Sequence, residues 1–253
     1  TWDPCSGYDY NKDIIYGFTH THLSGTGCTD LIDVSLMPLS RAVTPEQLAA
    51  ADFGQHYNHK KESARPGYYQ VLLQESDVNV ELSATVRTGI HKYTFPKGKN
   101  QTLVLDLDRG TFRGEAYYSK RRAYDVIQAQ IRLVDDHTIE GYRVITGWAK
   151  MRKVYFRAEF SKPIVSHILM NGNLNVGNSD VVNGRTLRAA LSFDPKDGKE
   201  LMVKVAISPV DNEGARKNML AEAPGWDFDQ YVKAAHDVWQ KELSRIDVEG
   251  TDE

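Results

Sequence analysis

Apolar side chains stand at every second position in three stretches of this sequence, at residues 80–86, 154–160 and 201–207, and polar residues fill most of the positions between them. Successive side chains of a β-strand point to opposite faces, so a period of two predicts strands that are buried on one face only. Such strands belong to antiparallel sheets that cover a core on one side. No helical periodicity separates the stretches, and the pattern therefore predicts an antiparallel β-sandwich in a mainly β protein.

Turn sequences stand between the expected strands. They are Pro-Lys-Gly at 96–98, Asn-Gly-Asn at 171–173 and Asp-Pro-Lys-Asp-Gly at 194–198. Proline presets the backbone angle of a turn, while glycine and asparagine tolerate the positive φ that many turns require. These segments therefore predict tight connections between neighbouring strands.

The end of the chain has a different periodicity. Apolar residues recur there at steps of three and four, at Phe228, Val232, Ala235, Trp239, Leu243 and Ile246. This spacing predicts an amphipathic helix of about five turns, with Asp227 as its N-cap and Gln230 at the N3 position. The apolar stripe needs a partner, either the sandwich or a following domain. We therefore divide the chain into a β-sandwich domain at 1–212 and a helical linker at 213–253.

The composition excludes several classes of protein. The net charge is −3 and both signs are mixed along the chain, which gives no sign of a nucleic-acid partner. The longest apolar runs have the length of strands, so no membrane span is predicted. Two cysteines, Cys5 and Cys28, form no CxxC motif. Two free thiols are favoured, and the sequence leaves a disulfide open.

Two histidines stand one residue apart at His20 and His22. On a strand both would point to the same face and could converge on one metal ion or one substrate. A catalytic zinc site needs a third histidine or carboxylate, and the spacing recommends neither His56 nor His59. We therefore favour histidines that shape a loop or contact a polar ligand over metal binding, and acid–base catalysis is a third alternative.

Other candidates lie near these histidines. Asp30 and Asp33 could each line a cleft, although stabilisation of a turn through backbone amides is the favoured alternative. Trp2 is surrounded by turn residues, which suits a ring that packs against the apolar face of a sugar. The segment Ser-Gly-Thr-Gly at 24–27 is not a phosphate-binding loop. It lacks the Gly-Lys-Ser/Thr ending of such loops, and it does not stand between a strand and a helix.

Longer blocks are more specific than any of these motifs. WDPCSGYDY at 2–10 is followed by YGFTHTHLSGTGCTDLIDVSLMP at 16–38, and further blocks stand at 67–96, 139–163 and 203–229. Together they resemble glycoside hydrolase family 92, the calcium-dependent exo-acting α-mannosidases, in the family's order and over nearly the whole chain.

The resemblance implies a particular domain organisation. Members of the family have an N-terminal β-sandwich of the supersandwich type, a short helical linker and a C-terminal (α/α)6 barrel, with the active site between the domains. This chain is similar to the sandwich and the linker only, and the strands that usually precede WDPCSGYDY are missing. The family's general acid and base come from the barrel, so we assign no catalytic residue and no metal ligand to this chain.

The resemblance further implies that this chain forms one wall of a sugar site. The residues expected to bind substrate are Trp2, His20, His22, Gly25, Thr26, Gly27 and Asp30. The full-length protein is expected to remove terminal α-linked mannose, most commonly α-1,2-linked, from glycans such as N-glycans. The expected mechanism is inversion with the help of Ca²⁺. The barrel is expected to pack on the linker helices, and the location to be the periplasm or cell surface.

A second hypothesis is a stand-alone carbohydrate-binding or structural β-sandwich without catalysis. The aromatic stripe of the helix at 228–246 favours the hypothesis of an α-mannosidase with an attached barrel, because the stripe has the character of a docking surface. On that hypothesis this chain alone is inactive.

Overall fold

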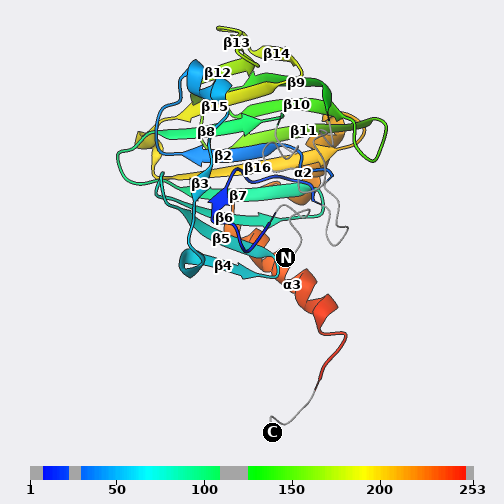
Figure 1. Ribbon diagram of the computed structural model, residues 1–253. Helices are drawn as coiled ribbons and strands as arrows, with labels where there is room; N and C mark the ends of the chain where they lie inside the picture. Colours follow the sequence, from blue (N-terminus) through cyan, green and yellow to red (C-terminus); the bar gives the residue numbers. More distant parts are fainter. Residues whose placement is uncertain (1–7, 23–29, 109–124, 249–253) are drawn as a thin grey trace.

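The computed structural model describes residues 8–22, 30–108 and 125–248. In this part of the chain, antiparallel sheets of nine and five strands pack face to face, and two longer helices follow the last strand (Figure 1). The predicted antiparallel β-sandwich is therefore confirmed. Cys5 and Cys28 lie outside the described residues, and their pairing stays open.

Neighbouring strands in each sheet are antiparallel, and the order runs from one edge of the sheet to the other. The nine-stranded sheet consists of β14 (Val181–Gly184), β9 (Val126–Asp135), β10 (Thr138–Ile145), β11 (Arg152–Phe160), β16 (Glu200–Ser208), β7 (Thr88–Thr94), β6 (Val78–Ala84), β5 (Tyr68–Leu73) and β4 (Glu62–Arg65). The five-stranded sheet consists of β13 (Leu174–Asn175), β12 (Ile164–Asn171), β15 (Leu187–Phe193), β8 (Gln101–Asp106) and β2 (Ser35–Leu39). The short elements are β1 (Ile14–Ile15), which pairs with β3 (Gln55–His56), the helix α1 (Pro45–Ala50), and the 3-10 turns η2 (His59–Lys61) and η3 (Pro195–Asp197).

The core lies between the two sheets, where the predicted alternation places it. In β11 every second side chain is buried, and Phe156 and Phe160 are completely enclosed. β6 ends at Ala84, so Val86, which the alternation placed in the same strand, instead lies exposed in the connection to β7. The turns predicted at 171–173 and 194–198 are confirmed by positive φ angles at Gly172 (58°) and Gly198 (99°).

Two helices, α2 (Asn212–Glu222) and α3 (Phe228–Leu243), pack on the outer face of the nine-stranded sheet. The predicted cap of α3 is confirmed, because the Asp227 carboxylate accepts a 3.1 Å hydrogen bond from the backbone N–H of Gln230. The helix ends at Leu243, whereas the sequence pattern predicted it to continue to Ile246. No helix among the described residues combines the length and apolar composition that crossing a bilayer requires.

The apolar stripe of α3 is divided into two parts. Phe228, Tyr231 and Val232 are buried against the sheet, where they form a small cluster with Ile90 of β7. Farther along the helix, Trp239 and its stripe neighbours are exposed, and in Figure 1 this part extends past β4 at the edge of the sheet. The sandwich therefore covers only the first half of the predicted stripe.

One end of the sandwich, called here the loop-bearing end, gathers the termini of strands from both sheets. Its members follow from the pairing register: Ser35 of β2 opposes Asp106 of β8, Ile145 of β10 opposes Arg152 of β11, and Thr88 of β7 opposes Ala206 of β16. This end therefore holds the starts of β2, β7 and β11 and the ends of β8, β10 and β16.

Candidate functional site

Two short segments form an antiparallel arm at the loop-bearing end. We define the arm as residues 18–22 and 30–36. Four backbone hydrogen bonds join its two sides: Phe18 and Leu36 bond each other in both directions (2.8 and 2.9 Å), His20 donates to Asp33 (2.9 Å), and Ile32 donates to Thr21 (2.8 Å). The arm therefore carries His20, His22 and Asp30 into one region. The predicted site residues Gly25, Thr26, Gly27 and Trp2 lie outside the described residues, and their roles stay predictions.

The second side of the arm has an unusual backbone. Leu31, Ile32 and Val34 all have positive φ, at 70°, 58° and 52°. Positive φ is rare outside glycine, and for β-branched residues such as isoleucine and valine it is a clear outlier. Each such residue costs on the order of 1–3 kcal/mol and persists only where surrounding contacts impose it, often at functional sites.

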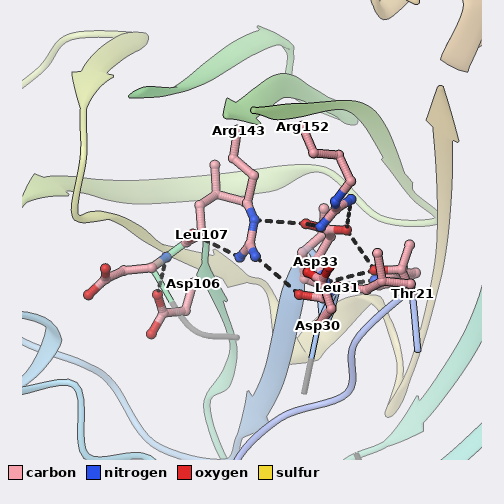
Figure 2. Close-up of polar contacts among 11 residues, drawn as sticks. Thr21, Asp30, Leu31, Asp33, Asp106, Leu107, Arg143 and Arg152 are labelled. Carbon is pink, nitrogen blue, oxygen red and sulfur yellow. Dashed lines mark hydrogen bonds and ion pairs between the residues drawn. The ribbon is translucent and has the colours of Figure 1, made fainter. Parts of the chain in front are cut away.

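Asp33 supplies those contacts. Its carboxylate is fully buried and binds two arginines: Oδ1 lies 2.8 Å from Nε of Arg143, and Arg152 donates through Nη1 and Nη2 at 2.7 and 3.0 Å (Figure 2). The hydroxyl of Thr21 donates to the same carboxylate at 2.6 Å. Burial acts to raise the pKa of Asp33, but the two arginines and Thr21 outweigh it and hold this pKa below its ordinary value. Asp33 is therefore an anion that fastens the arm to β10 and β11.

Arg143 extends the connection to the five-stranded sheet. Its Nη1 donates to the carbonyl of Leu107, just after β8, at 3.1 Å, and its Nη2 donates to the carbonyl of Leu31 at 3.3 Å (Figure 2). Arg143 is a charged side chain among the inward positions of β10, and it is almost completely buried. One guanidinium therefore ties together the strained backbone of the arm, its carboxylate and the end of β8.

His20 is held by protein groups at both ring nitrogens. Nδ1 lies 2.6 Å from the carbonyl oxygen of Val34, and Nε2 lies 2.8 Å from Nε2 of His91 in β7. Nδ1 of His91 lies in turn 2.8 Å from the hydroxyl of Tyr93. Burial lowers the pKa of His20 to about 4. His20 is therefore neutral near pH 7, and it has no ring nitrogen left for a metal ion or a sugar hydroxyl.

His22 has a different environment. It is exposed, its backbone pairs with Leu31, and its Nε2 contacts the hydroxyl of Thr19. The two rings of the His-Thr-His motif therefore do not share a ligand in the described structure. His56 and His59, the other histidines considered from the sequence, contact carboxylates elsewhere in the sandwich, those of Glu75 and Glu62. Of the two motif histidines, only His22 offers its ring to the exterior.

Asp30 is buried, with 7% of its surface exposed. Its Oδ1 accepts a 2.6 Å hydrogen bond from the backbone N–H of Leu31, which is the first residue of the left-handed run. This is the turn-stabilising role that the sequence favoured for an aspartate at this position. Direct contact of Asp30 with a substrate stays a prediction.

The described residues do not fit a calcium site. Calcium takes six to eight oxygen ligands, usually with several carboxylates among them. Within the described ranges, no group of three or more His, Cys, Asp or Glu side chains could hold a metal ion. The carboxylates of Asp33, Asp106 and Asp108 are each bound by an arginine, the latter two by Arg188 at 3.0 Å. We therefore derive no step through calcium from this chain.

Sequence reasoning missed the residues that support the arm, namely His91, Tyr93, Arg143 and Arg152. A signal was present for two of them. Arg143 occupies an inward position between Ile139 and Ile145 of the same strand, and His91 stands two residues before the inward Tyr93. A charged or polar side chain on an apolar face needs a buried partner, and such positions are candidates for a site.

Two models of protein families match the chain. The model of the glycosyl hydrolase family 92 N-terminal domain matches residues 1–208, and the model of the family's catalytic domain matches residues 214–253. The chain belongs to glycoside hydrolase family 92. The arm lies within the part that matches the N-terminal domain.

Solved structures of the family are similar to this chain. The family 92 α-mannosidase BT3965 from Bacteroides thetaiotaomicron is 32% identical with a TM-score of 0.85, over 98% of this chain and 33% of that one. The same enzyme in complex with mannoimidazole gives 33% identity and a TM-score of 0.83, over 97% of this chain and 32% of that one. The family 92 inverting mannosidase BT2199 from the same organism, at 23% identity, a TM-score of 0.77 and coverage of 97% and 31%, shows the fold alone.

The chain spans about a third of the length of these family 92 structures. The catalytic-domain model accordingly meets it only from residue 214 onward. No curated protein matches the chain by sequence comparison. The comparisons therefore establish the family and the fold of this chain.

Proposed function

We propose that this chain is the N-terminal part of an exo-acting α-mannosidase that hydrolyses terminal α-linked mannose, with α-1,2 linkages as its principal substrates. The observation that carries the proposal is the 32% identity to an α-mannosidase over 98% of the chain. In this proposal the chain forms one wall of the sugar site. The general acid and base, which act by inversion, belong to the catalytic domain.

The geometry of the arm supports a binding role rather than a chemical one. Its buried carboxylate is an anion neutralised by two arginines, so it is suited neither to donating a proton nor to attacking a sugar. Its buried histidine is neutral and bound at both nitrogens. A wall with a fixed shape contributes by orienting the substrate, which lowers the entropic part of the barrier.

Two further parts of the proposal concern the whole protein. We propose that it binds a calcium ion whose ligands lie mostly outside this chain, an expectation supported by the family resemblance alone. We also propose that it acts on mannose-containing glycans in the periplasm or at the cell surface, a location supported by the family resemblance alone.

The proposal is tested with the full-length protein and with this chain alone. The full-length protein is expected to release mannose from α-1,2-mannobiose in the presence of calcium, and the 253-residue chain to release none, because it contains only the start of the catalytic domain. Release of mannose is followed by chromatography, and the anomer first formed, by NMR. Turnover by this chain alone would contradict the assignment of the acid and base. An inactive full-length protein that still binds mannosides would favour a carbohydrate-binding module.

We further propose that the catalytic domain packs on the exposed half of α3. Trp239 and Leu243 are 53% and 55% exposed although they continue the stripe that Phe228 and Val232 bury against the sheet. Burying a large apolar side chain contributes about 1.5–3 kcal/mol. An apolar helix face of this kind therefore has the character of an interface.

Trp239→Ser tests this packing. In the full-length protein the substitution is expected to lower stability by about 1.5–3 kcal/mol, because it removes an apolar side chain from an interface. In this chain alone the change should be near zero, since Trp239 is exposed. Urea denaturation of both proteins measures the difference, with Lys241→Ser as the control on the polar side of the same helix. Equal effects in the two proteins would refute the packing.

A further inference from the structure

His20, His91 and Tyr93 are connected by a chain of hydrogen bonds with only one possible direction. A carbonyl oxygen only accepts, so Nδ1 of His20 carries a proton and donates to Val34. Nε2 of the neutral His20 must then accept, which means that Nε2 of His91 carries a proton and donates. Nδ1 of His91 consequently accepts from the hydroxyl of Tyr93. The contacts therefore fix one tautomer for each histidine.

This series of hydrogen bonds begins in the core of the sandwich. Tyr93 is completely buried between the sheets, and His91 is 4% exposed. Both belong to the inward face of β7. Ile90, which directly precedes His91, lies on the opposite face and packs against α3. A buried polar group without its partner is costly, so rotation of the His91 ring would break two hydrogen bonds and rotation of the Tyr93 hydroxyl would break one.

The series of hydrogen bonds ends at the arm. His20 stands between Phe18, which pairs with Leu36, and His22, which pairs with Leu31. Its ring reaches inward to β7, while the ring of His22 remains exposed two residues later. The orientation of His20 therefore sets the direction in which the arm presents His22.

We propose that His91 and Tyr93 are positioning residues of the mannoside site. They fix the tautomer and orientation of His20, and through His20 they hold the arm so that His22 faces the sugar. Neither residue touches the substrate. The inference rests on the proposed function, because it takes the arm to be the wall of a mannoside site.

The kinetic test uses the full-length protein and α-1,2-mannobiose. Tyr93→Phe removes one hydroxyl and leaves the volume of the core unchanged. We expect kcat/KM to fall by about threefold to tenfold, mainly through KM, because a less rigid wall binds the sugar less well. Tyr231→Phe is the matched control, since it removes a buried hydroxyl that bonds the backbone of Gly225 on the far side of the sheet. The control should change kcat/KM by less than twofold.

A pair of substitutions at His91 separates positioning from folding. His91→Gln keeps one donor and one acceptor, so it can still bond His20 and Tyr93, whereas His91→Leu keeps neither. We expect His91→Gln to retain at least a third of the wild-type kcat/KM and His91→Leu to lose more than tenfold. Equal losses in the two variants at equal stability would overturn the inference.

Nitrogen-15 NMR of the histidine rings tests the geometry independently of activity. In the wild-type protein His20 should be protonated at Nδ1 and His91 at Nε2 from pH 5 to pH 8, and Tyr93→Phe should shift the signals of His91, His20 and His22. The opposite tautomers, or an unmoved His22 signal, would overturn the inference. A wild-type protein that shows these tautomers but releases no mannose would instead refute the proposed function, and the assignment to a mannoside site would be refuted with it.

Discussion

Asp33→Asn is expected to reduce the free energy of unfolding by about 3–5 kcal/mol, the usual cost of removing one partner from a buried ion pair. The carboxylate is fully buried and is the shared partner of Arg143 and Arg152. An asparagine of the same shape leaves both guanidinium groups without this negative charge. It also weakens the contacts that hold Leu31, Ile32 and Val34 at positive φ. Urea denaturation of the 253-residue chain measures the change.

The matched control for this substitution is Asp237→Asn in α3. Asp237 pairs with Lys233 at 2.6 Å, but both side chains are more than half exposed, and such pairs contribute about 0–1 kcal/mol. A loss below about 1 kcal/mol for Asp33→Asn would show that the ion cluster does not hold the arm.

The pH dependence of stability follows from the same carboxylate. The pKa of Asp33 is lower in the folded chain than in the unfolded chain, so the unfolded state binds its proton first as the pH falls. The contribution of Asp33 is therefore complete above its ordinary pKa and is lost as the pH falls through the lower, folded value. In Asp33→Asn this acid-dependent part of the stability curve should disappear.

Gly89→Ala is expected to reduce kcat/KM of the full-length enzyme by more than tenfold. A Cβ at residue 89 would lie 2.7 Å from Cδ2 of His20 and 3.3 Å from Nε2 of His91. The His20 ring cannot yield without losing its bonds to Val34 or His91. The arm must therefore shift, at a cost of about 1–3 kcal/mol typical of overpacking. Kinetics on α-1,2-mannobiose, with folding checked by circular dichroism, measure the effect.

Gly225→Ala is the control for this change. Residue 225 also has no unusual φ, and a Cβ there would meet only the hydroxyl of Tyr231 at an ordinary distance of 3.8 Å. This variant should keep wild-type kinetics. If Gly89→Ala did so as well, the close packing of His20 on β7 would have no role in the site.

The sandwich and the start of α3 were predictable because local chemistry determines them. Alternation in β11 and β16 needs only the pleat of a strand, and Asp227 caps α3 through a contact three residues away. The sequence could not predict that the sandwich covers only half of the apolar stripe of α3. Helical periodicity identifies an apolar face but does not show what packs against it. Periodicity also continued the helix to Ile246, where the structure ends it at Leu243.

The candidate site was only partly predictable. The family blocks drew attention to the arm, and the spacing of His20 and His22 suggested a shared face. The structure places the two rings in different environments because His20 bonds His91, a residue 71 positions away. No local pattern contains such a contact. The left-handed backbone at Leu31 and Ile32 was equally hidden, since leucine and isoleucine give no sign of positive φ.

The arrangement around Asp33 also bears on the order in which the chain acquires its structure. The carboxylate is synthesised 119 residues before its partner Arg152, and Leu31 precedes Arg143 by 112 residues. Closing such long loops carries an entropic penalty that later contacts must offset. During synthesis, the Asp33 carboxylate therefore lacks both arginine partners until β10 and β11 have emerged. Because β10 and β11 also contribute Ile139, Phe156 and Phe160 to the core, the backbone of the arm and the packing between the sheets are completed by the same late strands.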